Sequence, residues 1–87
     1  MIAKIAVMPK PVLNDPQGAT VRQGLNALGF HDVSEVRVGK LIEVTLEAAG
    51  EDEARPRVEE MCRKLLANGV IEDFTFELTT DGGPVAP

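Results

Sequence analysis

The most regular pattern of the chain lies at its centre, where apolar residues alternate with polar ones from residue 36 to residue 47. A period of two is typical of a strand or hairpin with one buried face, and Gly39-Lys40 is its one interruption. Shorter strand-like stretches lie near both ends of the chain. The pattern predicts strands at residues 2–8, 33–38, 41–48 and 73–79.

A first helix is predicted to begin at Asp15-Pro16. The carboxylate of Asp15 can accept hydrogen bonds from the free N–H groups of a first turn, and Pro16 fits the first helical position, where no N–H is needed. Leu28-Gly29-Phe30 is typical of a helix end, because glycine tolerates the left-handed conformation that follows many helices. The apolar stripe between these ends comprises Val21, Leu25 and Leu28.

A second helix is predicted from about Glu53 to Asn68. Pro56 is placed in its first turn, because a proline further inside would remove a backbone hydrogen bond. Asn68-Gly69-Val70 resembles the end of the first helix. The apolar stripe of this second helix is the strongest in the chain and comprises Ala54, Val58, Met61, Cys62 and Leu65.

The predicted element order is strand, helix, strand, strand, helix, strand. This βαββαβ order is that of a ferredoxin-like, two-layer α+β sandwich. We expect a four-stranded antiparallel sheet with both helices on one face. Residues 1–80 form the single predicted domain, and residues 81–87 have the composition of a flexible C-terminal tail.

The connection at Gly39-Lys40 leaves three arrangements open. A two-residue turn would pair Val36 with Glu43 and place that glutamate on the core face, because a one-residue shift of register exchanges the faces. A bulge or an odd-numbered turn would instead pair Val36 with Val44, so that all apolar side chains share one face. Arg37 would then lie opposite Glu43. The third arrangement is one long bent strand without reversal. We favour the second, the odd-register hairpin.

Size and charge exclude several classes of function. A chain of 87 residues and 9.3 kDa buries only about two-thirds of its extended surface, so its own core is modest. A net charge of −5 argues against nucleic acid and against anionic membrane surfaces as partners. Residues 1–4 begin a strand and not a signal peptide, and the apolar runs are too short to span a bilayer. A single cysteine excludes an internal disulfide and suits a reducing cytoplasm.

Residues that could carry chemistry are present, but a structural role explains each of them better. Cys62 could be a nucleophile with His31 as its base, yet it lies on the apolar stripe of the second helix, where a free cysteine acts as a small hydrophobe. Gly39-Lys40 lacks the glycine-rich pattern of a phosphate loop. One cysteine and one histidine disfavour a zinc site. Surface charge or core packing accounts for the remaining candidates, which are Glu51-Asp52-Glu53, Glu59-Glu60, Phe74 and Phe76. We therefore predict a module without catalytic residues and without a metal site.

Five blocks in chain order closely resemble the PurS family, the small subunit of bacterial and archaeal phosphoribosylformylglycinamidine (FGAM) synthase. Together they extend over nearly all of residues 2–78, which makes the resemblance specific. The blocks are Leu13-Asn14-Asp15-Pro16-Gln17-Gly18, Leu28-Gly29-Phe30, Val36-Arg37-Val38-Gly39-Lys40, Glu60-Met61-Cys62-Arg63-Lys64-Leu65-Leu66-Ala67-Asn68 and Val70-Ile71-Glu72-Asp73-Phe74.

The resemblance implies a role in the fourth step of purine synthesis. In that family the large subunit PurL uses ATP and magnesium to convert formylglycinamide ribonucleotide to FGAM, and the glutaminase PurQ releases the ammonia. PurS carries no catalytic residues and bridges the two. The resemblance therefore implies that this chain binds no cofactor itself, has PurL and PurQ as partners, and forms a homodimer or higher homo-oligomer.

Two segments are the candidate contacts with partners or with a second copy. They are the start of the first helix (Asp15, Pro16, Gln17, Gly18) and the central turn (Arg37, Gly39, Lys40). Two other functions stay open at this point. One is a ferredoxin-like regulatory domain that senses a small molecule, and the other is a stand-alone enzyme that uses Cys62.

Overall fold

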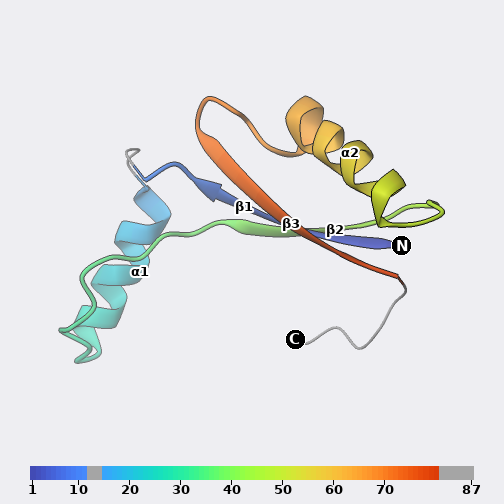
Figure 1. The fold of residues 1–87 in the computed structure, drawn as a ribbon. Coiled ribbons are helices and arrows are strands. Elements are labelled where there is room, and N and C mark those ends of the chain that lie inside the picture. The colour runs from blue at the N-terminus through green and yellow to red at the C-terminus, as the bar shows by residue number, and fades with distance from the viewer. Residues whose placement is uncertain (12–14, 81–87) are drawn as a thin grey trace.

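The structure, a computed structural model, describes residues 1–11 and 15–80 (Figure 1). The predicted tail at residues 81–87 and the predicted contribution of Leu13-Asn14 to the family resemblance lie outside these residues. In chain order the elements are β1 (Ile2–Pro9), α1 (Pro16–Ala27), β2 (Lys40–Thr45), α2 (Glu51–Met61), the single π-helical turn η1 (Cys62–Leu66) and β3 (Glu72–Thr79).

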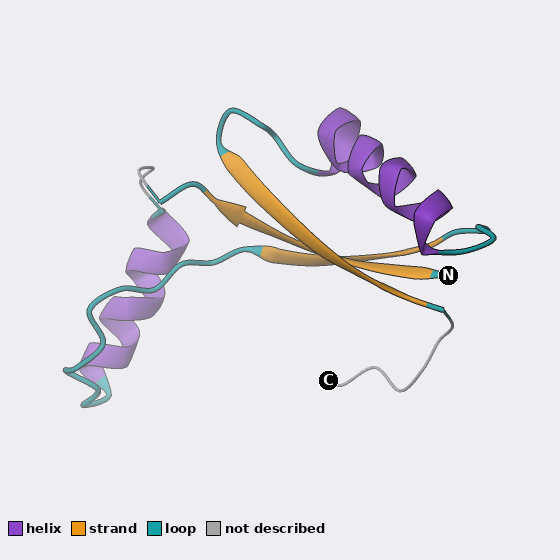
Figure 2. Cartoon of the chain, viewed as in Figure 1, coloured by secondary structure: helices purple, strands orange, loops and turns teal. Residues whose placement is uncertain are grey.

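The three strands of the described chain form one antiparallel sheet in the order β2-β1-β3. The central strand is therefore the first in sequence, and it pairs with the last strand along its full length, from Ile2 opposite Thr79 to Pro9 opposite Glu72. The helix α2 lies across one face of this sheet (Figure 2). The predicted α+β class with an antiparallel sheet is confirmed.

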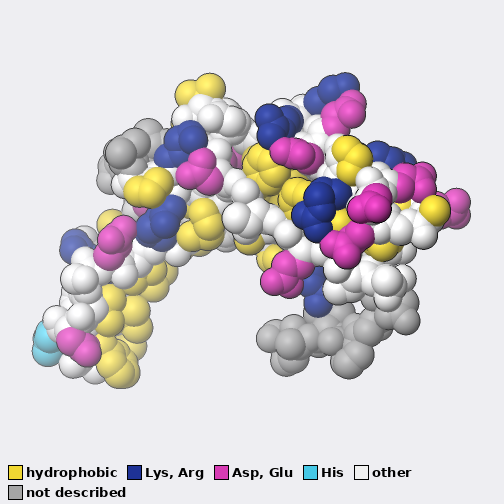
Figure 3. Space-filling view, viewed as in Figure 1, with side chains coloured by type: hydrophobic (Ala, Val, Ile, Leu, Met, Phe, Trp, Pro, Cys, Tyr) yellow, Lys and Arg dark blue, Asp and Glu magenta, His cyan; other side chains and the backbone are white. Residues whose placement is uncertain are grey.

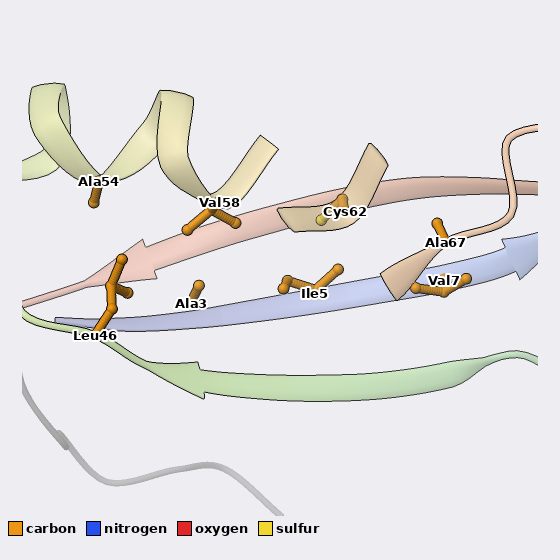
Figure 4. Packing of buried hydrophobic residues seen from close by; sticks show 8 residues of the cluster. All are labelled: Ala3, Ile5, Val7, Leu46, Ala54, Val58, Cys62 and Ala67. Carbon is orange, nitrogen blue, oxygen red and sulfur yellow. The ribbon is translucent and has the colours of Figure 1, made fainter. Parts of the chain in front are cut away.

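The core lies between β1 and the helical segment formed by α2 and η1 (Figure 4). Alternate residues of β1 point toward the helix, and Ala3 and Ile5 have no exposed surface. Val58 and Cys62 cover them and have none either. The partly buried side chains Phe74, Phe76 and Leu78 of β3 extend this cluster, as their predicted inward orientation requires.

The turn η1 changes the face that the end of the second helix buries. Its backbone closes a wider loop, in which the Ala67 N–H donates to the Cys62 carbonyl five residues before it, at 2.9 Å. The extra residue continues the buried stripe from Cys62 to Ala67, and Leu65 is left 83% exposed. The prediction that Leu65 belongs to the core stripe was wrong for this reason.

The ends of the helices agree with the sequence only in part. Asp15 caps α1, and Gly29 has φ 101° at its C-terminal end, as predicted. Gly69 does not repeat that conformation, because among the described residues only Gly29 has a positive φ. The helix α2 begins at Glu51, two residues earlier than predicted, so Pro56 lies beyond its first turn.

The largest difference from the prediction is the position of α1. Residues 33–39 form no strand, and the chain continues through them into β2 without reversing, so the predicted odd-register hairpin was wrong. The third arrangement, an extended chain without reversal, is the one observed. Because the chain does not turn back, α1 lies beyond the end of the sheet and not beside α2 (Figure 1). Its only buried residue is Gly18.

Candidate interaction site at the junction of α1 and β2

The two segments predicted as contacts meet at one place in the structure. The start of α1 and the chain that enters β2 lie side by side next to the end of β1. A groove of about 180 Å³ is lined by Asp15, Gly18 and Arg37 among others. The adjoining groove, of about 330 Å³, is lined by Asp15, Gln17, Gly39 and Lys40 among others. We call this region the junction.

Asp15 ties the two segments of the junction together. One oxygen of its carboxylate accepts from the Gly18 N–H at 3.0 Å, which caps α1. The other accepts from the Val38 N–H at 2.9 Å, on the segment 23 residues further along the chain. These bonds favour the ionised carboxylate, that from Val38 most, so the pKa of Asp15 lies below its ordinary value of 3.8. A residue predicted as a simple helix cap is therefore also a cross-link between segments.

Two glycines allow the backbones of the junction to approach each other. A Cβ atom on Gly18 would lie 2.0 Å from the carbonyl oxygen of Val36. A Cβ atom on Gly39 would lie 2.2 Å from the Met8 sulfur and 2.4 Å from the Val7 carbonyl oxygen. Real Cβ atoms do not approach other atoms so closely, so the contacts require glycine at both positions.

Polar side chains around the junction hold the same segments. The Arg37 guanidinium donates to the carbonyl of Pro9 at the end of β1. The Lys40 amine lies 4.0 Å from the Glu72 carboxylate at the start of β3. The Arg22 guanidinium donates to the Ser34 carbonyl at 3.3 Å. Sequence reasoning missed Arg22, Ser34 and Glu72, because their proximity depends on the path of the chain after α1.

The described residues contain no catalytic arrangement. Cys62 is fully buried, and burial, together with the charge of Glu59, raises the pKa of its thiol. His31 is exposed in the loop after α1 and does not belong to the core around Cys62. No group of three or more His, Cys, Asp or Glu residues in the described part of the chain could hold a metal ion. Within the same residues, no helix is long and apolar enough to cross a membrane.

Asp15→Asn is expected to remove a pH-dependent part of the stability. Asparagine retains one oxygen that can cap α1, but its amide group would face the Val38 N–H with another donor. Because the folded-state pKa of Asp15 is lowered, the contribution of its carboxylate is present above the unfolded value and is lost as the pH falls through the folded one. Denaturant unfolding of both proteins at about pH 7 and about pH 3 measures the difference.

The stability gap between wild type and Asp15→Asn should shrink between these two pH values. Asp32→Asn, at an exposed position in the loop after α1, is the matched control for the loss of one carboxylate. A gap of the same size at both pH values would mean that the two bonds of the carboxylate do not depend on its charge.

The fold and the junction define a small α+β protein with two adjoining polar grooves and, in its described part, no catalytic arrangement of residues. A family model described as PurS, phosphoribosylformylglycinamidine (FGAM) synthase, matches residues 2–80. The chain belongs to the PurS family, whose curated relatives are named as subunits of that synthase. This confirms the resemblance found in the sequence.

Relatives and solved structures support this membership. The PurS subunit of Synechocystis is 48% identical over 84 residues, which cover 97% of this chain and 84% of that protein. The crystal structure of Methanocaldococcus jannaschii PurS, one of the subunits of formylglycinamide ribonucleotide amidotransferase, is similar with a TM-score of 0.78 and 39% identity, over 87% of this chain and 92% of that one. A chain in the structure of PurLQS from Thermotoga maritima has a TM-score of 0.76 and 29% identity, over 88% and 96%.

Proposed function

We propose that this chain is a non-catalytic subunit of a cytoplasmic FGAM synthase and works together with PurL and PurQ proteins. The observation that carries the proposal is the match to the PurS family over residues 2–80. The similarity to a chain in a PurLQS structure supports the choice of partners. In this proposal the complex, and not this chain, uses ATP and magnesium to convert formylglycinamide ribonucleotide to FGAM.

A subunit without chemistry of its own has a clear physical use in such a complex. Ammonia released from glutamine would be protonated or would diffuse away in water before it reached the synthetase site. A protein that holds the glutaminase against the synthetase keeps the two active sites close. Ammonia then reaches the synthetase site from within the complex and not from dilute solution. The chain is suited to this role, because its described residues form a three-stranded sheet with a hydrogen-bonded junction at one end.

The junction is the part of the chain that we propose contacts PurL or PurQ. It brings together the exposed cations Arg37 and Lys40, the polar Gln17, and backbone held in place by Asp15. Arg37 and Lys40 already contact Pro9 and Glu72, so their side chains lose less conformational freedom on binding, and charges held in this way fix the orientation of a partner.

Reconstitution with purified PurL and PurQ proteins tests the proposed function. Glutamine-dependent FGAM formation should be low with the two larger proteins alone and should rise at least about tenfold when this chain is added, because the two active sites are then held together. The chain alone should show no activity. Equal activity with and without this chain would contradict the adaptor role. The Cys62→Ala variant should support the same activity of the complex. A loss of activity with this variant would favour an enzyme that uses the thiol.

Arg37→Glu is expected to weaken the association of the chain with PurL and PurQ, measured by co-elution on a sizing column. The change reverses a charge at the junction and removes the bond to the Pro9 carbonyl. Arg63→Glu, an equal charge change on the exposed side of η1, is the matched control and should co-elute as the wild type does. Equal behaviour of the two variants would remove Arg37 from the contact surface.

A further inference from the structure

Most cationic side chains of the described chain are already paired with carboxylates. Figure 3 shows basic and acidic groups side by side over α2, where the chain forms the pairs Arg55–Glu51, Arg63–Glu59 and Lys64–Glu60. Lys10 and Lys40 pair with acidic residues at the start of β3. Within the described residues, the Lys and Arg side chains with no carboxylate within 4.0 Å are Lys4, Arg22, Arg37 and Arg57.

Two of these four cations, Arg22 and Arg37, line the same groove. It is the groove of about 180 Å³ at the junction, and Pro9 and Ser34 line it too. The Arg37 guanidinium donates to the Pro9 carbonyl, and the Arg22 guanidinium donates to the Ser34 carbonyl at 3.3 Å, so both heads lie at the wall of the groove. A guanidinium has several N–H donors in a planar fork. Among the described residues no further hydrogen bond engages either one, so the remaining donors are open to an acceptor that enters the groove.

The path of the chain brings the two arginines together. The segment that leads into β2 runs beside α1 in the opposite direction, because Asp15 accepts from Val38 at one end and Arg22 donates to Ser34 at the other. Arg22 therefore reaches the groove from the helix and Arg37 reaches it from the extended segment. Their side chains belong to the two walls of one groove, although 15 residues separate them in the sequence.

Two acidic side chains also line the groove, but they offset its positive charge only in part. The Asp15 carboxylate accepts from two backbone N–H groups, and these bonds, that from Val38 above all, lower its pKa more than the charge of Arg37 does. Glu35 is exposed and has no hydrogen bond or ion pair with the described residues. Since Lys10 is paired, the groove keeps two unpaired cations against one unpaired acid, on a chain whose net charge is −5.

The size of the groove limits what can enter it. Sites for drug-sized ligands measure about 300 Å³ or more, whereas this groove has a volume of about 180 Å³. A carboxylate is small and planar, and its two oxygens accept from the paired N–H groups of a guanidinium. One acidic side chain presented by another protein therefore fits both the volume and the charge.

We propose that the groove takes a carboxylate of a partner protein, either an Asp or Glu side chain or a C-terminal carboxylate, held by Arg22 and Arg37. This rests on the proposed function, in which the junction contacts PurL or PurQ, and it names the chemical group that the partner brings to that contact. Glu35 lies beside the same groove and repels a carboxylate there. Changes of Arg22 and of Glu35 must therefore alter the binding of the partner in opposite directions.

Binding of the full chain to immobilised PurL, to immobilised PurQ and to the two together tests the proposal. Arg22→Gln should raise the Kd at least about tenfold, because charge-assisted hydrogen bonds are lost. Glu35→Gln should lower the Kd about threefold, because it removes a repulsion between exposed charges. The effect of Arg22→Gln should shrink between about 0.1 M and about 0.5 M salt, which screens exposed charges.

Arg63→Gln and Glu77→Gln make the same charge changes at exposed positions on η1 and β3, and both should bind as the wild type does. Urea unfolding shows whether each variant is folded, and Glu35→Gln, which removes no bond, still tests the charge of the groove if Arg22→Gln is unstable. If Arg22→Gln and Glu35→Gln bind as their controls do, or if both bind more weakly, the carboxylate is overturned and the proposed function stands. A wild type that binds neither PurL nor PurQ would overturn both.

The same measurements separate a carboxylate of the partner from a free anion. Millimolar succinate or inorganic phosphate should leave the urea midpoint of the chain unchanged, because an anion that is not part of a larger contact gains little from two exposed arginines. A rise of the midpoint that Arg22→Gln removes would assign the groove to a free anion and would overturn the partner's carboxylate as its occupant.

Discussion

Gly18→Ala is expected to destabilise the protein more than any other single methyl group added to the junction. The new Cβ would lie 2.0 Å from the Val36 carbonyl oxygen, and 2.8 Å from a carboxylate oxygen of Asp15. Neither can move freely, because the first is backbone and the second belongs to a carboxylate whose two oxygens accept from the N–H groups of Gly18 and Val38. Overpacking of this kind costs about 3 kcal/mol, even though alanine is the better helix former by about 1 kcal/mol.

Urea unfolding at one fixed protein concentration measures the loss, since association would make the midpoint depend on concentration. Gln23→Ala, at an exposed position of the same helix, is the control and should change the stability by less than about 0.5 kcal/mol. A stability of Gly18→Ala equal to that of the wild type would show that α1 does not rest on residues 36–38.

Gly39→Ala has the second largest expected effect, with a loss of about 2 kcal/mol. The methyl group would meet the Met8 sulfur at 2.2 Å and the Val7 carbonyl oxygen at 2.4 Å. The thioether of Met8 is flexible and can move aside. The Val7 carbonyl belongs to the central strand of the sheet and cannot.

The double variant Gly39→Ala with Met8→Ala separates these two contacts. Removal of the Met8 side chain should restore only part of the stability, because the clash with the Val7 carbonyl remains. Full recovery would assign the whole effect to the side chain. Ser34→Ala, exposed in the same segment, serves as the control and should unfold at the wild-type urea concentration within error.

Local signals determined which elements the sequence could predict. The capping geometry of Asp15 and the glycine at position 29 are set by neighbours in the chain, and the structure has both where they were expected. The strand predicted at residues 2–8 is likewise present, as β1 (Ile2–Pro9). Such features depend on a few adjacent residues, so composition and spacing are enough to find them.

The position of α1 and the shape of η1 could not be predicted in the same way. Whether the chain reverses at Gly39 depends on long-range contacts, such as the close approach of Gly39 to Val7 and Met8. The parity of the central pattern did indicate that a simple turn fails, and the structure has no turn there. The wider turn at Cys62–Leu66 shifts the buried stripe by one residue. The sequence of that stretch contains no signal that predicts a π-helical turn.

The sequence predicted the residues of the junction as two separate groups. It did not predict that the two groups contact each other. Asp15 and Gly18 were expected at a helix start, and Arg37 and Gly39 at a turn. Nothing in the spacing of 19 to 24 residues between them required contact. The hydrogen bond from the Val38 N–H to the Asp15 carboxylate joins the two groups. The sequence did not indicate this bond, because capping of the first helix is already a sufficient reason for an aspartate at position 15.

The pairing of the first strand with the last also sets when the protein can fold during its synthesis. Ile2 pairs with Thr79 and Pro9 with Glu72, so one edge of the central strand has no partner until residues 72–79 have been made. The other edge waits for Lys40–Thr45. Contacts so distant in sequence form slowly, and an apolar strand without neighbours can associate with other chains. We therefore expect the nascent chain to remain unfolded until Thr79 has left the ribosome, and to form its sheet only then.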